Sequence, residues 1–280
     1  MGLEGRGAHY TFTRHLNEEL LDRLFRGGWP ARLAEDLGLL PRLRTLEYDL
    51  PIATWPTHAP RLRLAFASDF HAGPTTTPRQ LDDAAAALTA ARPDVLLLGG
   101  DFVYLRTAYL EPLAQALSQV PAPLGRFAVL GNHDLWADDR AITRRLEAAG
   151  VQVLVNQAVP LPPPFSGVAI CGLDEPWTGR PDAAATLRGA DGVRVVLDQE
   201  TRGQADGQDW AGIHLHPADT GGLMISFDEP ELFAFGETLA ARSSFVARDA
   251  LGWSVEEAAR RAGMEAAHVR AIESEAFDHF

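Results

Sequence analysis

The sequence predicts an α/β fold in which strands and helices alternate, and three observations support it. From residue 61 onward, short apolar runs alternate with longer segments of helical character, the order expected when a helix follows each buried strand. The runs hold few charged residues, as buried strands do. The composition, 46% hydrophobic and 22% charged over 280 residues, is that of an ordinary globular protein. The expected strands are residues 62–67, 95–98, 127–130, 151–155, 168–172 and 193–197, and the expected helices between them are 80–91, 110–119 and 140–149.

Charge and cysteine content narrow the classes of function. The formal net charge is −13, and every basic residue is an arginine. Because such a chain repels the phosphate backbone, nucleic-acid binding is not expected. Cys171 is the only cysteine, so an internal disulfide bond is excluded. No apolar run reaches about 18 residues, and the first residues lack the apolar segment of a secretory signal. We therefore expect a cytoplasmic protein without a membrane span.

Three regions are expected along the chain. Residues 1–60 form an appendage with two short helices within residues 15–37. The apolar stripe of the first helix is expected to contact the core rather than a membrane. Residues 61–197 form the α/β core. Residues 198–280 form a divergent C-terminal segment, which either completes a second sheet or is a fused fragment. A change in charge near residue 188 agrees with a boundary there, because residues 188–280 hold 8 arginines against 17 acidic residues.

Polar side chains able to bind a metal ion follow three of the expected strands. Asp69 and His71 come after the first of these strands, and Asp101 comes after the second. Asn132 and His133 come after the third. The spacings of 32 and 31 positions between Asp69, Asp101 and Asn132 correspond to one strand–helix–strand unit each. The carboxyl ends of parallel strands lie at one edge of a sheet, where α/β proteins bind ligands. We therefore expect these side chains to lie close together.

The residue types point to a divalent metal. Carboxylate, amide and imidazole groups together suit Mn²⁺, Fe²⁺ or Zn²⁺. Two such ions held about 3.5–4 Å apart activate a water molecule and stabilise a phosphoryl group during hydrolysis. Taken singly, each aspartate could be only the N-cap of the helix that follows its strand. Three clusters on successive strand ends favour a metal centre over three unrelated caps.

The three loops resemble the motifs of a known family. The segments SDFHAG (residues 68–73), GGDFV (99–103) and VLGNHD (129–134) match, in order and spacing, the first three motifs of the calcineurin-like metallophosphoesterases. The resemblance covers about residues 45–197. Together with CGLDEPWTG at 171–179, it is closest to the bacterial branch that includes UDP-2,3-diacylglucosamine hydrolase-type enzymes. It implies a four-layer α/β/β/α sandwich, here with an N-terminal helical extension and a divergent C-terminal segment that ends in helices.

The same resemblance implies a metal-binding role for four residues. Asp69 and His71 would bind the first of two divalent ions, which would be Mn, Fe or Zn. Asp101 would bridge both ions. Asn132 would bind the second ion.

It also implies the catalytic groups and the reaction. His133 would act as a general acid, oriented by Asp134, because imidazole titrates near neutral pH. The reaction would be the hydrolysis of a phosphoric ester or pyrophosphate by a hydroxide bound to two metal ions. A small-molecule or lipid-linked phosphoester would be the substrate, and peripheral membrane contact is left open.

The later motifs of the family are incomplete in this chain. The family has a lone histidine after a strand, but no histidine stands between the third motif and His214. The chain instead continues from the strand at 193–197 with Asp198, Gln199 and Glu200. Gln199 takes the place of the histidine, and either neighbouring carboxylate could replace it as a ligand.

A partial counterpart of the last motif, Gly-His-x-His, lies in GIHLH at 212–216. His214 and His216 would share one face of a strand, since alternate residues point the same way. By the resemblance His214 would serve the second metal and His216 the first. Both could equally be ordinary strand histidines.

Three other interpretations remain open. The missing histidine allows a catalytically impaired homologue that still binds metal. Residues 192–196 and 212–229 resemble half a module of the vicinal-oxygen-chelate superfamily, in which His216 would bind one metal. Residues 254–273 resemble a helix-turn-helix, but acidic residues outnumber arginines there, so a helical cap on the fold is the default.

Overall fold

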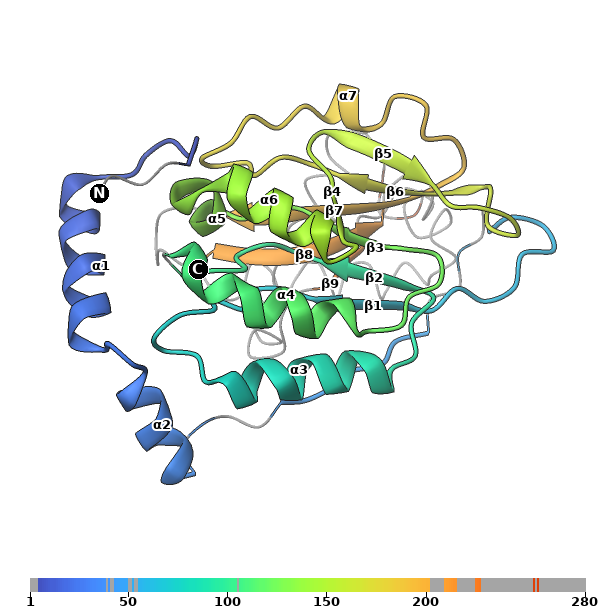
Figure 1. The fold of residues 1–280 in the computed structure, drawn as a ribbon. Helices are drawn as coiled ribbons and strands as arrows, with labels where there is room; N and C mark the ends of the chain where they lie inside the picture. Colours follow the sequence, from blue (N-terminus) through green and yellow to red (C-terminus); the bar gives the residue numbers. More distant parts are fainter. Residues whose placement is uncertain are drawn as a thin grey trace.

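A computed structural model shows how the strands and helices are arranged. It describes residues 5–38, 40, 43–49, 52, 55–104, 106–201, 209–215, 225–227, 254 and 256; of 198–201, 209–215 and 225–227 it describes the backbone. The described strands form one sheet of four strands and one of five. Helices cover the outer face of the first sheet (Figure 1).

All neighbouring strands of the first sheet are parallel, in the order β1-β2-β3-β4. Parallel neighbours need a crossover connection, and a helix supplies each one. The strands are β1 (Leu64–Ala67), β2 (Val95–Leu98), β3 (Arg126–Ala128) and β4 (Gln152–Val153), and the crossovers contain α3 (Pro78–Ala90), η1 (Thr107–Tyr109), α4 (Leu110–Ser118), α5 (Asn132–Ala137) and α6 (Asp139–Ala148). Alternation of strands and helices was therefore predicted correctly for this half, within a few residues at each boundary.

The second sheet is mixed. Its strands follow the order β5-β6-β7-β8-β9, and only β6 and β7 are parallel neighbours. The strands are β5 (Gln157–Pro160), β6 (Val168–Gly172), β7 (Val193–Thr201), β8 (Asp209–Leu215) and β9 (Ile225–Phe227), with α7 (Ala183–Thr186) between β6 and β7. The backbone of residues 209–215 and 225–227 thus extends the sheet to which β6 belongs.

Buried side chains define the order of the layers. Leu96 and Leu98 of β2 pack in the core beneath the outer helices. The alternate residues Val95 and Leu97 pack in a second core, which they share with Ile170 of β6. This two-residue alternation is what a strand buried on both faces produces. The prediction of a mixed α/β fold with a parallel sheet and helices is confirmed.

The outer face of the second sheet is covered, among the described residues, by the segment around α7. Ala169 and Cys171 of β6 form a small core with Ala190, and Leu187 packs against it. Cys171 is fully buried, as expected for a core cysteine rather than a reactive one.

Two details of the sheets differ from the sequence prediction. No strand was predicted between residues 155 and 168, yet β5 lies there and pairs with β6. β7 was expected to end at Leu197, but its backbone continues to Thr201 because β8 pairs with it along that length. Long-range pairing of this kind overrides local sequence preference.

The N-terminal helices are α1 (Phe12–Leu24) and α2 (Trp29–Asp36). The stripe of residues 16–25 was expected to contact the core, yet Leu16, Leu20 and Leu24 are 58%, 62% and 58% exposed, and only Leu21 and Phe25 are half-buried. None of the described helices has the length and apolar character that crossing a bilayer requires. The helices expected within 254–273, by default a cap on the fold, lie outside the described residues, apart from Ser254 and Glu256.

Candidate metal centre

The loops after β1 and β2 run side by side and present their polar side chains together. The backbone N–H of Asp69 donates to the carbonyl of Gly100 (3.0 Å), and that of His71 donates to the carbonyl of Asp101 (2.9 Å). Asp69, His71 and Asp101 have φ values of 53°, 40° and 52°. Residues other than glycine rarely adopt this left-handed conformation, and where they do so together they tend to serve a function.

Gly100 allows the loops after β2 and β3 to approach each other. Its φ is 97°, and a Cβ atom placed on it would lie 2.5 Å from the backbone nitrogen of Gly131. Because that neighbour is backbone, it cannot rotate away. Across this contact the N–H of His133 donates to Oδ1 of Asp101 (3.0 Å). The glycine therefore fixes how closely the third loop approaches the second.

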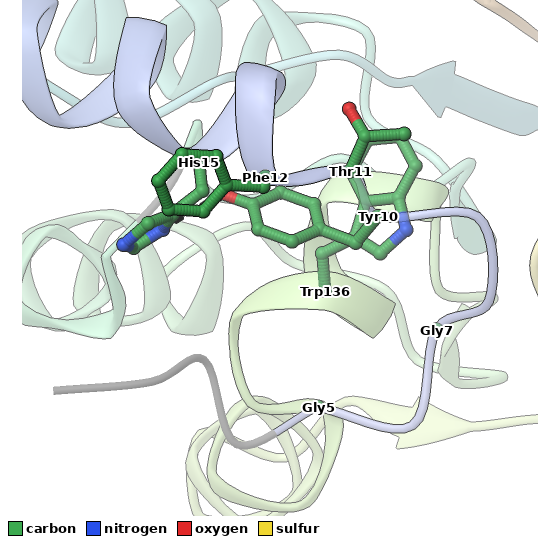
Figure 2. A pocket seen from close by; sticks show the side chains of 7 residues that line it. All are labelled: Gly5, Gly7, Tyr10, Thr11, Phe12, His15 and Trp136. Atoms are coloured by element: carbon green, nitrogen blue, oxygen red, sulfur yellow. Dashed lines mark hydrogen bonds between the residues drawn. The ribbon is translucent and has the colours of Figure 1, made fainter.

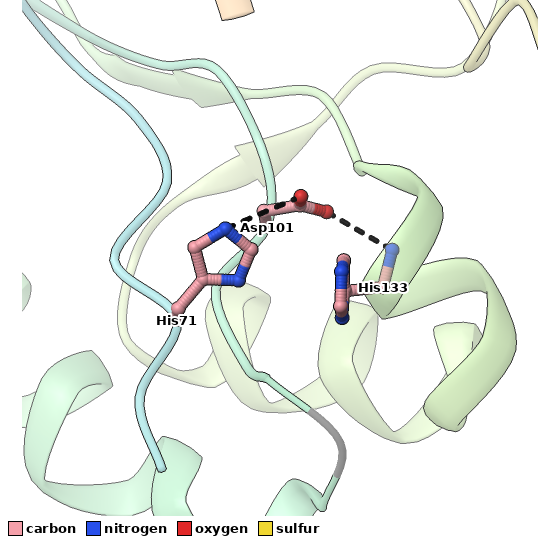
Figure 3. A group of neighbouring side chains, drawn as sticks. All are labelled: His71, Asp101 and His133. Carbon is pink, nitrogen blue, oxygen red and sulfur yellow. Dashed lines mark hydrogen bonds and ion pairs between the residues drawn. The ribbon is translucent and has the colours of Figure 1, made fainter. Parts of the chain in front are cut away.

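The three loops converge on one cluster. One ligand atom from each of His71, Asp101 and His133 lies within 4.8 Å of the others (Figure 3). His71 Nε2 also lies 3.7 Å from a carboxylate oxygen of Asp69 and 3.7 Å from one of Asp101. Asn132 is fully buried at the first position of α5, next to His133. The structure thus brings together the side chains of Asp69, His71, Asp101 and His133.

The cluster carries buried charge. Burial raises the pKa of Asp101 well above its usual range, although the nearby His71 opposes the shift. Burial also raises the pKa of Asp134 to about 7, against hydrogen bonds donated by backbone N–H groups. Burial alone would lower the pKa of His71, but its contact with Asp69 and the charge of Asp101 outweigh this and raise it. Neighbouring carboxylates in a dry site favour an added cation.

The donor set fits a divalent cation. Among the described side chains, Asp101 Oδ2 and Ser68 Oγ are buried without a hydrogen-bond partner, as is Nδ1 of His71. Unsatisfied buried oxygens and ring nitrogens are rare unless an ion or water completes them. Carboxylate and imidazole donors of this kind are those that manganese, iron and zinc accept.

The imidazole of His133 is oriented by a backbone carbonyl. Its Nδ1 hydrogen-bonds the carbonyl oxygen of Tyr104, and the two rings stack with centroids 5.3 Å apart. Because a carbonyl can only accept, Nδ1 carries the hydrogen, and Nε2 is the nitrogen that gains or loses a proton. The motifs gave no sign of Tyr104, since a backbone oxygen leaves no signature in the sequence.

Asp134, which was expected to orient His133, accepts hydrogen bonds from the backbone of two loops. Its two carboxylate oxygens accept hydrogen bonds from the N–H of Val103 (3.2 Å) and of Gly131 (3.0 Å). Val103 precedes Tyr104 in the chain. Asp134 thus ties the loop that holds the Tyr104 carbonyl to the loop that carries His133.

The N-terminal segment forms a wall beside the site. Arg6 binds both carboxylate oxygens of Asp174 (2.7 and 2.6 Å) and one of Asp139 (3.1 Å). The indole N–H of Trp136 donates to the carbonyl of Ala8 (2.7 Å). Sequence reasoning treated residues 1–60 as an appendage and missed this packing, because no motif marks it.

A pocket of about 360 Å³ opens at this wall (Figure 2). The pocket is lined by Gly5, Gly7, Tyr10, Thr11, Phe12, His15 and Trp136. Trp136 connects it to the cluster, since its ring lies edge-to-face with that of His133 at 5.4 Å. The aromatic pocket and the candidate metal centre therefore share a boundary.

The structure describes only the backbone of some of the expected C-terminal ligands. His214 lies on β8, where its backbone pairs with Val196 of β7. Asp198, Gln199 and Glu200 lie within β7 rather than in a loop after it. The side chains of these four residues, and all of His216, lie outside the described residues.

Comparison with known families agrees with the geometry. Residues 62–181 match the family model described as calcineurin-like phosphoesterase. This part of the chain is therefore similar to the calcineurin-like phosphoesterases. The matched range contains all three loops of the cluster, and the resemblance stated from the motifs is confirmed.

Several curated proteins are similar to part of this chain. An uncharacterized metallophosphoesterase from Aquifex aeolicus is 31% identical over 133 residues, which are 48% of this chain and 49% of the relative. Phosphodiesterase YaeI from Escherichia coli is 29% identical over 136 residues, 46% of this chain and 49% of the relative. UDP-2,3-diacylglucosamine pyrophosphatase LpxG from Chlamydia trachomatis is 35% identical over 96 residues, 34% of this chain and 29% of the relative. The chain spans about half or less of the length of these relatives.

Proposed function

We propose that this protein hydrolyses phosphoric esters or pyrophosphates with the help of divalent metal ions. The observation that carries the proposal is the buried Asp101 carboxylate between His71 and His133, with their ligand atoms within 4.8 Å of one another. A wholly buried carboxylate with an unsatisfied oxygen is costly unless a cation neutralises it.

Each candidate ligand has a place in this proposal. Asp69 and His71 would hold the first ion, Asp101 would bridge two ions, and Asn132 would hold the second. From the C-terminal part, His214 would add to the second ion and His216 to the first. Bound there, the ions, which we expect to be Mn, Fe or Zn, would activate water as a nucleophile and neutralise the charge that develops on the phosphoryl oxygens.

The chain itself supplies the proton. His133, whose Nδ1 is held by the Tyr104 carbonyl, would give the proton on Nε2 to the departing oxygen. Asp134 would act as a positioning residue, because it holds the Tyr104 loop against the third loop. A fixed tautomer and a fixed ring plane are what a general acid requires.

The relatives suggest the kind of substrate. One is named a phosphodiesterase and another a pyrophosphatase of a nucleotide-linked diacyl sugar. We propose the shared chemistry, a phosphodiester or pyrophosphate in a small-molecule or lipid-linked substrate, for this chain.

The division into residues 1–60, 61–197 and 198–280 and a cytoplasmic location also stay predictions.

Hydrolysis of bis-(p-nitrophenyl) phosphate by the full chain tests the proposal. Turnover should require added Mn²⁺ and stop with a chelator. Asp101→Ala should abolish it, whereas Asp83→Ala, which removes a carboxylate that is 61% exposed on α3, should leave it unchanged. No turnover with any of the three metals, or equal turnover in both variants, contradicts the proposal.

A second candidate is a homologue that binds metal but is catalytically impaired. Gln199 stands where the family has a histidine, and its backbone is paired with Ala211 inside the sheet. Elemental analysis decides between the two. Two ions per chain with turnover support the hydrolase, and one ion per chain without turnover supports the impaired homologue.

A further inference from the structure

The two N-terminal helices expose a row of large apolar side chains. We call this row the apolar face of α1–α2. It consists of Phe12, Leu16, Leu20, Leu24, Trp29, Leu33 and Leu37, which are 80%, 58%, 62%, 58%, 50%, 49% and 62% exposed. The four residues of α1 are spaced four apart, so they lie along one side of the helix. Single exposed leucines are common, but a row of seven marks a surface that contacts something apolar.

These helices attach to the domain by their polar side. Glu19 and Asp22 of α1 bind the guanidinium of Arg106 (2.6 and 2.9 Å), in the loop after β2. Glu35 of α2 lies 3.4 Å from Arg79 of α3. An amphipathic helix on a protein surface normally turns its apolar side inward. Here Glu19 and Asp22 turn toward the domain instead, so contact with the described part of the chain does not bury the apolar face of α1–α2.

Cations accompany the apolar face. Arg23, Arg26 and Arg32 are exposed, and the side chain of Arg23 is 72% exposed despite lying 3.7 Å from Glu19. Described acidic side chains of α1 face the domain, whereas Asp36 at the end of α2 is exposed. Leucine, phenylalanine and tryptophan beside arginine are the composition of helices that lie in a membrane interface.

The apolar face leads to the candidate metal centre. Phe12 begins the row and also lines the aromatic pocket, whose far wall is Trp136 (Figure 2). Trp136 in turn lies against His133. Figure 1 places α1 at the side of the molecule reached by the loops that follow the strands of the first sheet. A surface that held this face would therefore lie next to the pocket.

We propose that the apolar face of α1–α2 binds the surface of an anionic lipid bilayer, with its leucines in the interface and its arginines on the lipid phosphates. A second copy of the chain is the rival occupant. In a symmetric pair, the same patch meets itself, so the exposed Arg23, Arg26 and Arg32 would face a second patch that carries the same three arginines. A bilayer rich in phosphate offers each of them an opposite charge. The surface proposal does not depend on hydrolysis.

Cosedimentation of the full chain with vesicles tests the proposal. The chain should bind vesicles of equal parts phosphatidylcholine and phosphatidylglycerol more strongly than vesicles of phosphatidylcholine alone. The double variant Leu16→Ser/Leu20→Ser should lower the partition coefficient on the order of tenfold or more. Arg26→Glu/Arg32→Glu should remove the preference for the anionic vesicles, and salt should weaken it.

Val155→Ser is the matched control and should leave vesicle binding unchanged. Val155 is also an exposed apolar residue, at 40%, but it lies in the bend between β4 and β5. Circular dichroism melting checks that all variants fold. Absence of vesicle binding, or binding that Leu16→Ser/Leu20→Ser leaves intact, overturns the proposal. The proposal is also overturned if light scattering shows a wild-type dimer that Leu16→Ser/Leu20→Ser dissociates, while the wild type does not bind vesicles.

Discussion

The candidate metal centre and the apolar face of α1–α2 depart from ordinary protein structure in opposite ways. In the first, carboxylates and imidazoles are buried, with Asp101 at 0% exposure; in the second, leucines are exposed, with Leu20 at 62%. Buried charge and exposed apolar surface are both unfavourable for an isolated chain. The comparison teaches that each region is completed by something the polypeptide does not supply, a cation in one case and an apolar surface in the other.

The largest expected effect is on catalysis. Asp101→Asn should reduce kcat/KM for bis-(p-nitrophenyl) phosphate by about 10³-fold or more, because the charge of the buried carboxylate is lost while its shape is kept. Without metal, the same variant should be as stable as the wild type or more stable at pH 7, measured by urea unfolding. The pKa of Asp101 is raised in the folded state, so its carboxylate destabilises the native fold increasingly as pH rises above about 4. A large loss of stability at pH 7 in chelator would contradict this account.

Leucines of the two environments should differ sharply in stability. Leu98→Ala, in a side chain with 0% exposure, should lower the free energy of unfolding by about 2–5 kcal/mol. Leu20→Ala should change it by less than about 0.5 kcal/mol. Paired urea titrations measure both. An equal loss in the two variants would mean that Leu20 is buried in solution.

Glycine substitutions in the two regions should also differ in their cost to stability. Gly100→Ala should cost about 2–3 kcal/mol, because it combines a positive φ with a contact against backbone. Gly38 has a φ of 66°, but no atom lies within 4 Å of a Cβ added to it. Gly38→Ala should therefore lower the free energy of unfolding only by the conformational penalty of about 1 kcal/mol. Thermal unfolding of both variants compares them, and similar losses would argue against the close approach of Gly100 to Gly131.

A substitution in the N-terminal wall beside the site should have the smallest effect on stability. Burial alone would raise the pKa of Asp174, but hydrogen bonds from Arg6 and from the backbone of Arg180 outweigh this and lower it. A lowered carboxyl pKa stabilises the fold above the unfolded value of 3.8 and loses that contribution as pH falls through the folded value. Asp174→Asn should therefore cost about 1 kcal/mol at pH 7 and nothing once the pH lies well below 3.8. A difference from the wild type that persists in acid would contradict the ion pair.

The first sheet and the three loops of the candidate metal centre could be predicted because their signals are local. Each strand is a short apolar run, and each loop carries its aspartate or histidine within a few residues of the strand end. The Val95–Leu98 strand was predicted with the bounds the structure has, since a run of four buried aliphatic residues next to two glycines leaves little choice.

The features that could not be predicted from the sequence depend on contacts between distant segments. The Tyr104 carbonyl orients His133 through backbone geometry, and Arg6 reaches Asp174 across 168 positions. The extension of β7 past Leu197 depends on pairing with β8. The outward turn of Leu20 follows from the polar anchoring of α1 on Arg106. None of these leaves a periodic or motif signal in the chain itself.

Thermal unfolding of the full chain, with a chelator and then with increasing Mn²⁺, tests most directly whether the three loops form a metal centre. A metal that binds only the native state raises the midpoint progressively with its concentration. We predict such a rise for the wild type and for Asp83→Ala, and a much smaller one for Asp101→Asn. An unchanged midpoint in the wild type, or an equal rise in Asp101→Asn, would contradict the central claim.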